Sequence, residues 1–208
     1  MLDALFLYIE QKSAQDLSEQ EKSIVAKAFT LKKLRKRQYF LQQGDVCGCL
    51  GFIVKGATRM YSVDSRGNEH VLQFGVEQLW VGDDESYNML YPSKYNIETV
   101  EETWLLTIGY EKIQEIIGLS PAIAATFRAM QIQATITLSK RLHRAISLNA
   151  EERFDDLLHN EPVFLARFPQ TMIASYLGIK PETLSRIKSN VLRKKPVGYK
   201  GGTLSISA

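Results

Sequence analysis

Residues 173–187 read IASYLGIKPETLSRI, which places two short amphipathic segments on either side of a glycine. Pro169 is suited to the start of the first segment, and Gly178 can take the left-handed conformation that often follows a helix. Lys180 and Pro181 then begin a second helix that extends through Leu192. The apolar residues of both helices can face one shared core: Ile173, Leu177, Ile179, Leu184, Ile187 and Val191. The pattern therefore predicts a helix-turn-helix.

The second helix carries polar side chains suited to reading DNA. Glu182 and Arg186 lie four residues apart, so they project from one face near its N-terminus. Arginine can bond O6 and N7 of guanine, glutamate can accept from N4 of cytosine, and each such pair discriminates by roughly 1–3 kcal/mol. The plainer alternative is a surface ion pair worth about 0.2–0.5 kcal/mol. We expect the DNA-binding surface to be completed, mainly by phosphate contacts, by Thr183, Ser185, Lys188, Ser189, Lys180, Gln170 and Thr171.

The distribution of charge favours the same interpretation. The net charge of the chain is +3, but the segment from Lys180 to the end holds seven basic residues and one acid, which leaves −3 for the rest. Such asymmetry is expected where one end of a protein meets phosphates, although a solvated basic end would look the same. After Pro196, residues 197–206 predict a small hairpin, or wing, with Lys200 near its tip.

Residues 40–108 show the pattern of short β-strands. Segments 50–54, 59–63, 70–74, 97–100 and 104–108 have strand character, and residues 64–68 form a turn-rich cluster between two of them. We therefore expect a small antiparallel sandwich or barrel. Before it, Ser18 and Glu21 predict a capping box that begins a helix, whereas residues 31–39 are basic and without a clear pattern. After it, a short helix over 110–117 is expected to stop at Gly118.

A long helix is predicted from Ser120 and Pro121 to about Ser147. One apolar stripe runs from Leu119 to Ala145, and a second runs from Ile132 to Ile146. Because each apolar stripe is expected to be buried, two stripes on one helix need two packing partners. One partner can be the β-domain, and the other can be the C-terminal domain or the same helix of a second subunit; burial inside a monomer would give the same pattern. A further helix over 149–158 is expected to end before Pro162.

The stretch from Ile173 to Ile187 closely resembles the helix-turn-helix of the CRP/FNR regulators, the relatives of the catabolite activator protein. Residues 51–56 and 59–61 resemble the cyclic-nucleotide-binding β-roll of that family, and the helix from Pro121 resembles its dimerisation helix. The resemblance implies an α+β fold: an N-terminal antiparallel β-roll (a jelly-roll-like double-stranded β-helix) in residues 1–118, a long dimerisation helix in 119–148, and a winged helix-turn-helix in 149–208. It also implies a homodimer, double-stranded DNA as partner and contact with RNA polymerase.

The effector pocket departs from the family pattern. Members that bind cyclic AMP have a Gly-Glu pair for the ribose and an Arg-Ser pair for the phosphate; here Gly82 and Asp83 stand for the first pair, and no arginine lies between residues 66 and 128. Lys94 is the cation nearest the expected phosphate position, in an acidic stretch that would repel an anion. We therefore predict that cyclic AMP is not a tight ligand, and that the effector is a different molecule or absent.

Other classes of function find little support in the sequence. Cys47 and Cys49 do not match the four-cysteine pattern of iron–sulfur members, and the three histidines lack metal-ligand spacing. We expect no metal, no cofactor and no catalysis, since no nucleophile elbow, phosphate-binding glycine loop or paired catalytic carboxylates appear. The absence of a signal-peptide pattern and of a long apolar run predicts a cytoplasmic protein without membrane association. The rival hypothesis is an effector-sensing, protein-interaction module with a vestigial DNA-binding domain.

Overall fold

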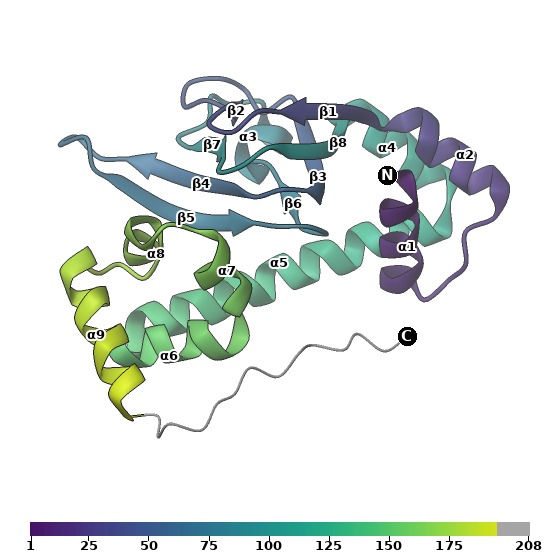
Figure 1. The fold of residues 1–208 in the computed structure, drawn as a ribbon. Helices are drawn as coiled ribbons and strands as arrows, with labels where there is room; N and C mark the ends of the chain where they lie inside the picture. Colours follow the sequence, from purple (N-terminus) through teal and green to yellow (C-terminus); the bar gives the residue numbers. More distant parts are fainter. Residues whose placement is uncertain (195–208) are drawn as a thin grey trace.

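The computed structural model describes residues 1–194, with a β-rich domain followed by a long helix and a cluster of shorter helices (Figure 1). The strands form two antiparallel four-stranded sheets, in the orders β1-β8-β3-β6 and β2-β7-β4-β5. Their bounds are β1 Thr30–Leu34, β2 Tyr39–Leu41, β3 Cys49–Lys55, β4 Thr58–Val63, β5 Glu69–Gly75, β6 Trp80–Val81, β7 Asn96–Thr99 and β8 Thr103–Gly109. This arrangement confirms the predicted β-roll.

Two helices precede the sheets. They are α1 (Leu2–Ser13) and α2 (Glu19–Ala28), and α2 begins with the predicted capping box between Ser18 and Glu21. In this box the Ser18 side chain accepts from the Glu21 amide, and the Glu21 carboxylate accepts from the Ser18 amide at 2.9 Å. The box satisfies backbone donors that the first turn of a helix leaves free.

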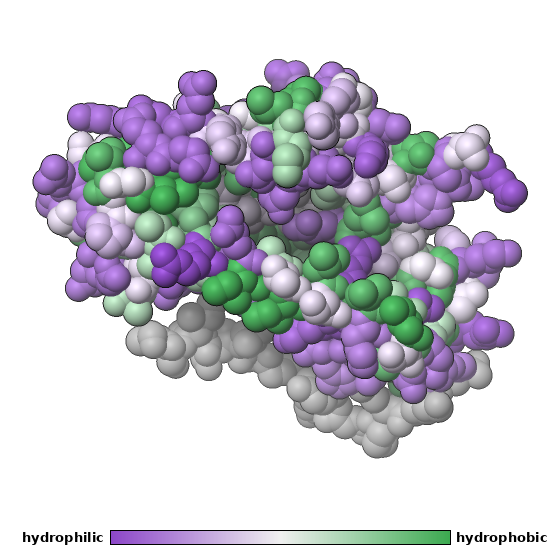
Figure 2. Space-filling view, turned by 180° about the vertical axis from the view of Figure 1, so that it is seen from behind, coloured by the Kyte–Doolittle hydropathy of each residue, from purple (hydrophilic) through white to green (hydrophobic). Residues whose placement is uncertain are grey.

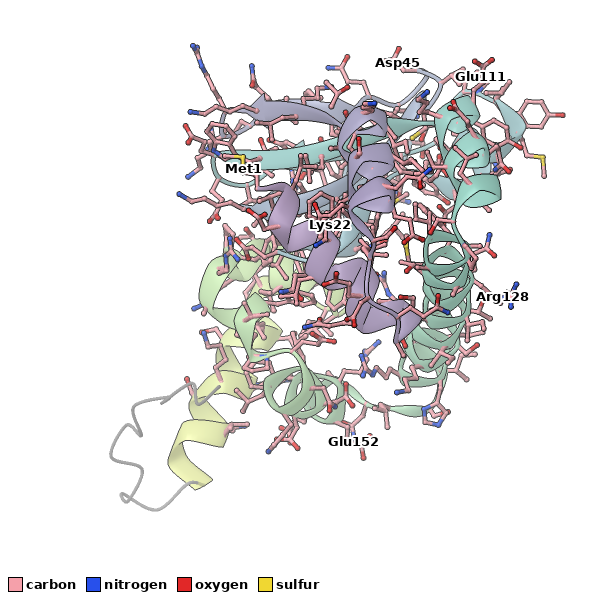
Figure 3. All side chains as sticks on the ribbon, turned by 90° about the vertical axis from the view of Figure 1, so that its right-hand side faces the viewer. Met1, Lys22, Asp45, Glu111, Arg128 and Glu152 are labelled. Atoms are coloured by element: carbon pink, nitrogen blue, oxygen red, sulfur yellow. The ribbon has the colours of Figure 1, made fainter. Side chains whose placement is uncertain are left out.

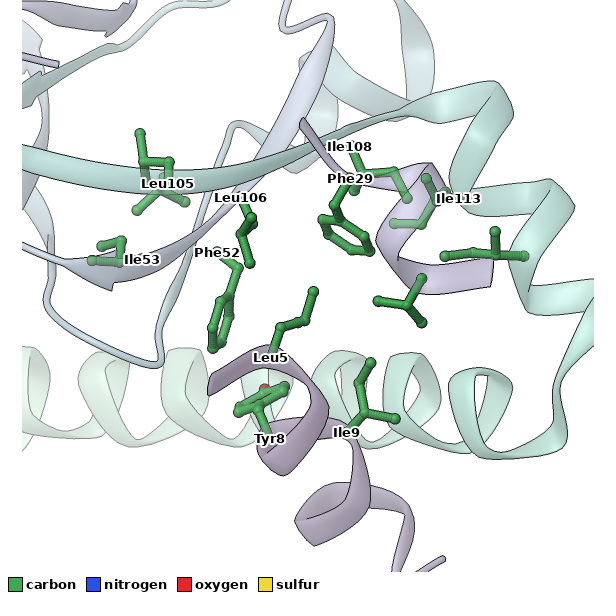
Figure 4. Close-up of a cluster of buried hydrophobic side chains, with 14 of the residues drawn as sticks. Leu5, Tyr8, Ile9, Phe29, Phe52, Ile53, Leu105, Leu106, Ile108 and Ile113 are labelled. Carbon is green, nitrogen blue, oxygen red and sulfur yellow. The ribbon is translucent and has the colours of Figure 1, made fainter. Parts of the chain in front are cut away.

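The main core lies between the first sheet, α1 and the start of the long helix (Figure 4). Leu5, Tyr8 and Ile9 of α1 are buried against Phe52 of β3 and Leu106 of β8. The Tyr8 and Phe52 rings lie 5.1 Å apart, a distance typical of favourable aromatic contacts. The N-terminal helix is therefore part of the β-domain core.

The link to the C-terminal region is made by α4 (Tyr110–Leu119) and α5 (Pro121–Ser147). As predicted, Ser120 is the N-cap of α5 and accepts from the Ile123 amide at 3.3 Å. The first turns of α5 pack beside α1, and Arg128 points away from α1 on the outer side of α5 (Figure 3). Within residues 1–194, no helix is both long enough and apolar enough to cross a bilayer.

The C-terminal helices are α6 (Ala150–Asn160), α7 (Pro162–Arg167), α8 (Gln170–Tyr176) and α9 (Pro181–Lys194). The Asn149 side chain caps α6 by accepting from the Glu151 and Glu152 amides. The buried residues of the four helices form one cluster: Phe154, Leu157, Phe164, Phe168, Ile173, Ala174, Leu177, Leu184 and Ile187. The fold class expected from the sequence is confirmed for the described residues, while the predicted wing with Lys200 lies outside them.

Several expectations about individual elements were wrong. Residues 30–34 form β1, where no strand was expected, because only Leu34 of that strand is buried and the others face solvent. Gly118 lies inside α4 and does not end it. Pro162 does separate α6 from the next segment, but it opens the unexpected helix α7, where its missing N–H costs nothing in the first turn.

A short helix, α3 (Asp84–Met89), follows β6 and was also not predicted. Asp83 is its N-cap, and the Asp83 side chain accepts from the Glu85 and Ser86 amides. The acidic run of the sequence is therefore the beginning of a helix, where negative charge is favoured by the helix dipole.

Candidate nucleic-acid interface

The turn between α8 and α9 is fixed by backbone hydrogen bonds. The Gly178 amide donates to the Ser175 carbonyl at 3.0 Å, and the Ile179 amide donates to the Ala174 carbonyl at 3.0 Å. Gly178 has a φ of +65°, which glycine adopts without steric cost. Ala174 is completely buried, and its small side chain allows the two helices to approach closely. The predicted helix-turn-helix geometry is therefore present in the described residues.

One face of α9 is buried and the other is open to solvent. Leu184 and Ile187 are buried against the C-terminal core, which fixes the rotation of the helix. The opposite face exposes Glu182, Ser185, Arg186 and Ser189, whereas Thr183 and Lys188 are half-buried. The Ser189 hydroxyl donates to the Ser185 carbonyl at 3.1 Å, one turn back along the same helix. Both candidate base-reading side chains are thus free to meet a ligand.

The remaining predicted DNA contacts lie at the ends of the two helices. Lys180 is exposed just before α9, and Gln170 and Thr171 are exposed in the first turn of α8. Among the described side chains, Glu182 and Arg186 form no salt bridge within 4.0 Å of one another, so the structure does not contain the surface pair considered as an alternative. The DNA-contact roles of these residues stay predictions.

Nothing in the sequence signals that α8 docks on the β-domain. Strand β5 is one of the two edge strands of the second sheet, and α8 packs against it. The Ser175 hydroxyl accepts from the Val71 amide at 2.9 Å and donates to the Glu69 carbonyl at 2.8 Å. These atoms belong to residues more than 100 positions apart in the chain, and no periodicity along the sequence reports such a contact.

Two further groups hold the C-terminal helices to the β-domain. Arg167 of α7 forms salt bridges with Glu77 and Glu101, and its Nη2 donates to Glu77 at 3.1 Å. Glu77 is partly buried, which by itself would raise its pKa, but hydrogen bonds from Arg167 and from the Gly56 amide hold that pKa below its usual value of 4.5. Arg141 of α5 donates to the Val71 carbonyl at 3.1 Å. Its guanidinium carbon lies 4.6 Å from the centre of the ring of Tyr176, where a cation is attracted to the aromatic face.

The predicted effector residues are not arranged as an open ligand-binding site. Asp83 is 4% exposed, and besides capping α3 its carboxylate accepts from the buried Ser93 hydroxyl at 2.6 Å. A Cβ added at Gly82 would lie 2.4 Å from the Leu50 side chain, so β3 already fills the space beside it. Lys94 is exposed and lies 3.7 Å from Glu85. The sequence indicated Gly82, Asp83 and Lys94 but missed Ser93, whose contact to Asp83 spans ten residues.

The middle of α5 presents an uncovered apolar surface. Every residue from 131 to 140 is exposed, although the turns before them are packed in the core. Hydrophobic residues appear in a broken row across the lower half of the face seen in Figure 2, along the course of α5. The large exposed apolar side chains of this stretch, named the α5 stripe below, are Ile132, Ile136, Leu138, Leu142 and Ile146. Both predicted stripes thus continue into solvent beyond Met130.

Comparison with known proteins finds similarity to bacterial regulatory proteins. The cyclic nucleotide-binding domain family matches residues 31–119. An anaerobic regulatory protein from Pasteurella multocida is 25% identical over 203 residues, covering 92% of this chain and 74% of its own. Over most of its length the chain is similar to regulators of the CRP/FNR family. A fumarate and nitrate reduction regulatory protein of Vibrio cholerae is 24% identical, covering 84% of this chain and 74% of its own.

The fold of this chain is also found in solved structures. FixK2 from Bradyrhizobium japonicum superposes with a TM-score of 0.71 at 19% identity, over 84% of this chain and 89% of FixK2. The match to the nucleotide-binding domain runs from β1 to the end of α4, whereas the relatives' similarity continues through the C-terminal helices. The chain is therefore similar to transcription regulators over most of its length, and the family resemblance expected from the sequence is confirmed.

Proposed function

We propose that this protein is a homodimeric transcription regulator that binds a near-palindromic double-stranded operator in a sequence-specific manner. The observation that carries the proposal is the exposed face of α9, on which Glu182 and Arg186 stand opposite the buried Leu184 and Ile187. A helix held in this way can enter the major groove with its N-terminal side chains toward base edges. Arg186 would read guanine and Glu182 cytosine, while the surrounding hydroxyl and basic groups would contact phosphates.

The partner of the α5 stripe is, in this proposal, the α5 helix of a second copy. Ile132, Ile136, Ser139, His143 and Ile146 alternate in steps of four and three residues, the spacing of the seam in a two-stranded coiled coil. The five exposed apolar side chains of the α5 stripe would be unfavourable in water for a monomer. A two-fold axis along α5 would place the two recognition helices on one side of the dimer, about 34 Å apart when bound to successive major grooves.

The effector of the sensor domain is, in this proposal, not cyclic AMP. The Asp83 carboxylate is already engaged by two amides and by Ser93, and the nearest cation, Lys94, lies beside Glu85. A cyclic phosphate would therefore find no bidentate donor and would meet acidic groups. RNA polymerase remains the expected protein partner of a regulator of this family. The proposal includes no catalytic step.

Selection from random double-stranded DNA tests the proposed function. We expect a two-fold symmetric motif, and we expect its affinity to fall steeply as salt is raised, because phosphate contacts release counterions. Arg186→Ala should lower affinity for the selected site at least tenfold while non-specific binding partly survives. Lys112→Ala is the matched control, since it removes one positive charge from α4 on the β-domain. Failure to enrich any motif would favour the rival function, an effector-sensing interaction module.

A further inference from the structure

The C-terminal helices and the second sheet share one hydrophobic cluster. Phe74 of β5 is 2% exposed, and its ring centre lies 3.9 Å from that of Phe168 and 5.3 Å from that of Phe164. The Phe74 ring is also 4.9 Å from the ring of Tyr176 on α8. Tyr61 of β4, Val71 of β5 and Ala57 of the β3–β4 turn are buried in the same cluster. Interfaces between domains of one chain are usually more polar than this and permit relative motion, so a shared aromatic core indicates a fixed arrangement.

Polar contacts fix the position and orientation of the C-terminal helices at this apolar interface. The Ser175 hydroxyl bonds both a donor and an acceptor on the free edge of β5, which sets the position of α8 along the strand. Arg167 reaches two carboxylates that belong to different loops of the β-domain, Glu77 after β5 and Glu101 after β7. A guanidinium between two carboxylates is a directional contact, because its donors form a rigid planar fork. Rotation or sliding of the C-terminal helices would break these contacts together.

The docked arrangement leaves the reading surface open. Glu182, Ser185 and Arg186 are exposed while α8 is bound to β5. The side of α8 that packs on β5 through Ser175 is thus distinct from the exposed face of α9. Figure 1 shows the β4–β5 hairpin and α8 side by side, with α9 beyond them at the margin of the molecule. The contact therefore holds the recognition helix without covering it.

We propose that Arg167, Ser175 and Phe74 are positioning residues that preset the recognition helix for DNA, without a small-molecule effector. This inference rests on the proposed function and deepens it. The groups that fix α8 all belong to the protein, and the Asp83 carboxylate of the predicted effector region is already engaged by the Ser93 hydroxyl. Preorganisation strengthens binding because the cost of ordering is not incurred when the complex forms.

A dimer whose recognition helices are held in fixed positions should bind tightly only to operators with one particular distance between half-sites. Moving two half-sites by one base pair changes their separation by about 3.4 Å and their relative rotation by about 35°. A rigid pair of recognition helices cannot follow such a change, whereas loosely tethered domains can follow it at little cost. The tolerance of half-site spacing therefore reports how firmly α8 is held, independently of whether Arg186 reads its base.

The experiment compares wild type with Arg167→Glu on the selected operator, on single half-sites, and on operators with the spacer changed by one and two base pairs. For wild type without added ligand we expect at least a tenfold loss of affinity per base pair of change. For Arg167→Glu we expect about a tenfold loss at the optimal spacing, less than a threefold spread across spacings, and half-site affinity within twofold of wild type. Lys112→Glu, which makes the same change of charge on α4, should behave as wild type.

Two further variants test whether the effect of Arg167→Glu comes from the loss of the contacts that hold α8 to the β-domain. Adding Glu77→Lys and Glu101→Lys to Arg167→Glu reverses the ion pairs and should restore the strict spacing preference. Ser175→Ala, which removes one hydroxyl, should shift spacing tolerance in the same direction by about threefold, so an unfolded Arg167→Glu protein would still leave a measurable result.

Three outcomes would overturn the inference. The first is a wild type that needs a small molecule to bind its selected operator. The second is an Arg167→Glu or Ser175→Ala protein whose spacing preference equals that of wild type. The third is tighter binding by Arg167→Glu at the optimal spacing, which would make the docked contact inhibitory. If selection recovers no motif at all, the proposed function itself fails; if a motif is recovered and any of these outcomes appears, only the present inference fails.

Discussion

Replacing Phe74 by alanine should uncouple the C-terminal helices from the β-domain. Phe74 lies almost completely buried, and its ring contacts Phe164, Phe168 and Tyr176. Truncating a buried phenylalanine to alanine costs about 3–5 kcal/mol, from lost transfer free energy and from the cavity left behind. Because three aromatic contacts are lost together, we expect the upper half of that range, about 4 kcal/mol, in the free energy of unfolding.

Urea unfolding at one fixed protein concentration measures this loss, since the stability of a dimer depends on concentration. Phe74→Leu keeps most of the volume and should cost about 1.5 kcal/mol or less. Tyr91→Ala removes an aromatic ring of the β-domain that is 64% exposed, and it should change the free energy of unfolding by about 0.5 kcal/mol or less. A loss below about 1 kcal/mol for Phe74→Ala would refute the shared core, because it would mean that the ring is not buried between the domains in solution.

Further predictions concern the dimer, the sensor region and pH. Leu142→Glu places a charge in the α5 stripe and should convert the dimer to monomer in sedimentation velocity, whereas Glu111→Lys on α4 should not. Asp83→Ala removes the α3 cap and leaves the Ser93 hydroxyl without its acceptor, so it should lower the melting temperature by several degrees, corresponding to about 2 kcal/mol, without creating a response to cyclic AMP. Glu77 has a lowered pKa in the folded protein, so its contribution to stability is complete above its usual pKa of 4.5 and is lost as pH falls through the folded value. The difference in unfolding free energy between wild type and Glu77→Gln should accordingly be constant above about pH 5 and shrink below pH 4.5; a difference that grows on acidification would contradict the ion pair with Arg167.

Much of the architecture could be predicted from local patterns. The capping box at Ser18, the start of α5 at Ser120 and the turn at Gly178 each depend on residues within a few positions of one another. Strong hydrophobic periodicity also identified α9 and most strands. Strand β1 was not predicted because four of its five residues face solvent, so its sequence shows no alternation of apolar and polar residues.

The parts of the site that could not be predicted depend on contacts between distant segments. Ser175 bonds to β5 over 104 and 106 positions, and Arg167 meets Glu77 and Glu101 over 90 and 66. An isolated serine or arginine in a polar helix gives no indication of such partners. The hydrogen bond from the Ser93 hydroxyl to the Asp83 carboxylate is a similar case, because it joins two segments that no local pattern links. Local patterns in the sequence located α9, and only the tertiary structure shows which contacts hold the C-terminal helices in place.

Parallel selections from random DNA with wild type and Arg186→Ala test most directly whether α9 reads bases. We expect wild type to recover a two-fold symmetric motif with a conserved guanine in each half, and Arg186→Ala to lose preference at that guanine while keeping other positions. Identical motifs from the two proteins would show that α9 does not read bases through this side chain, which would contradict the proposed DNA interface.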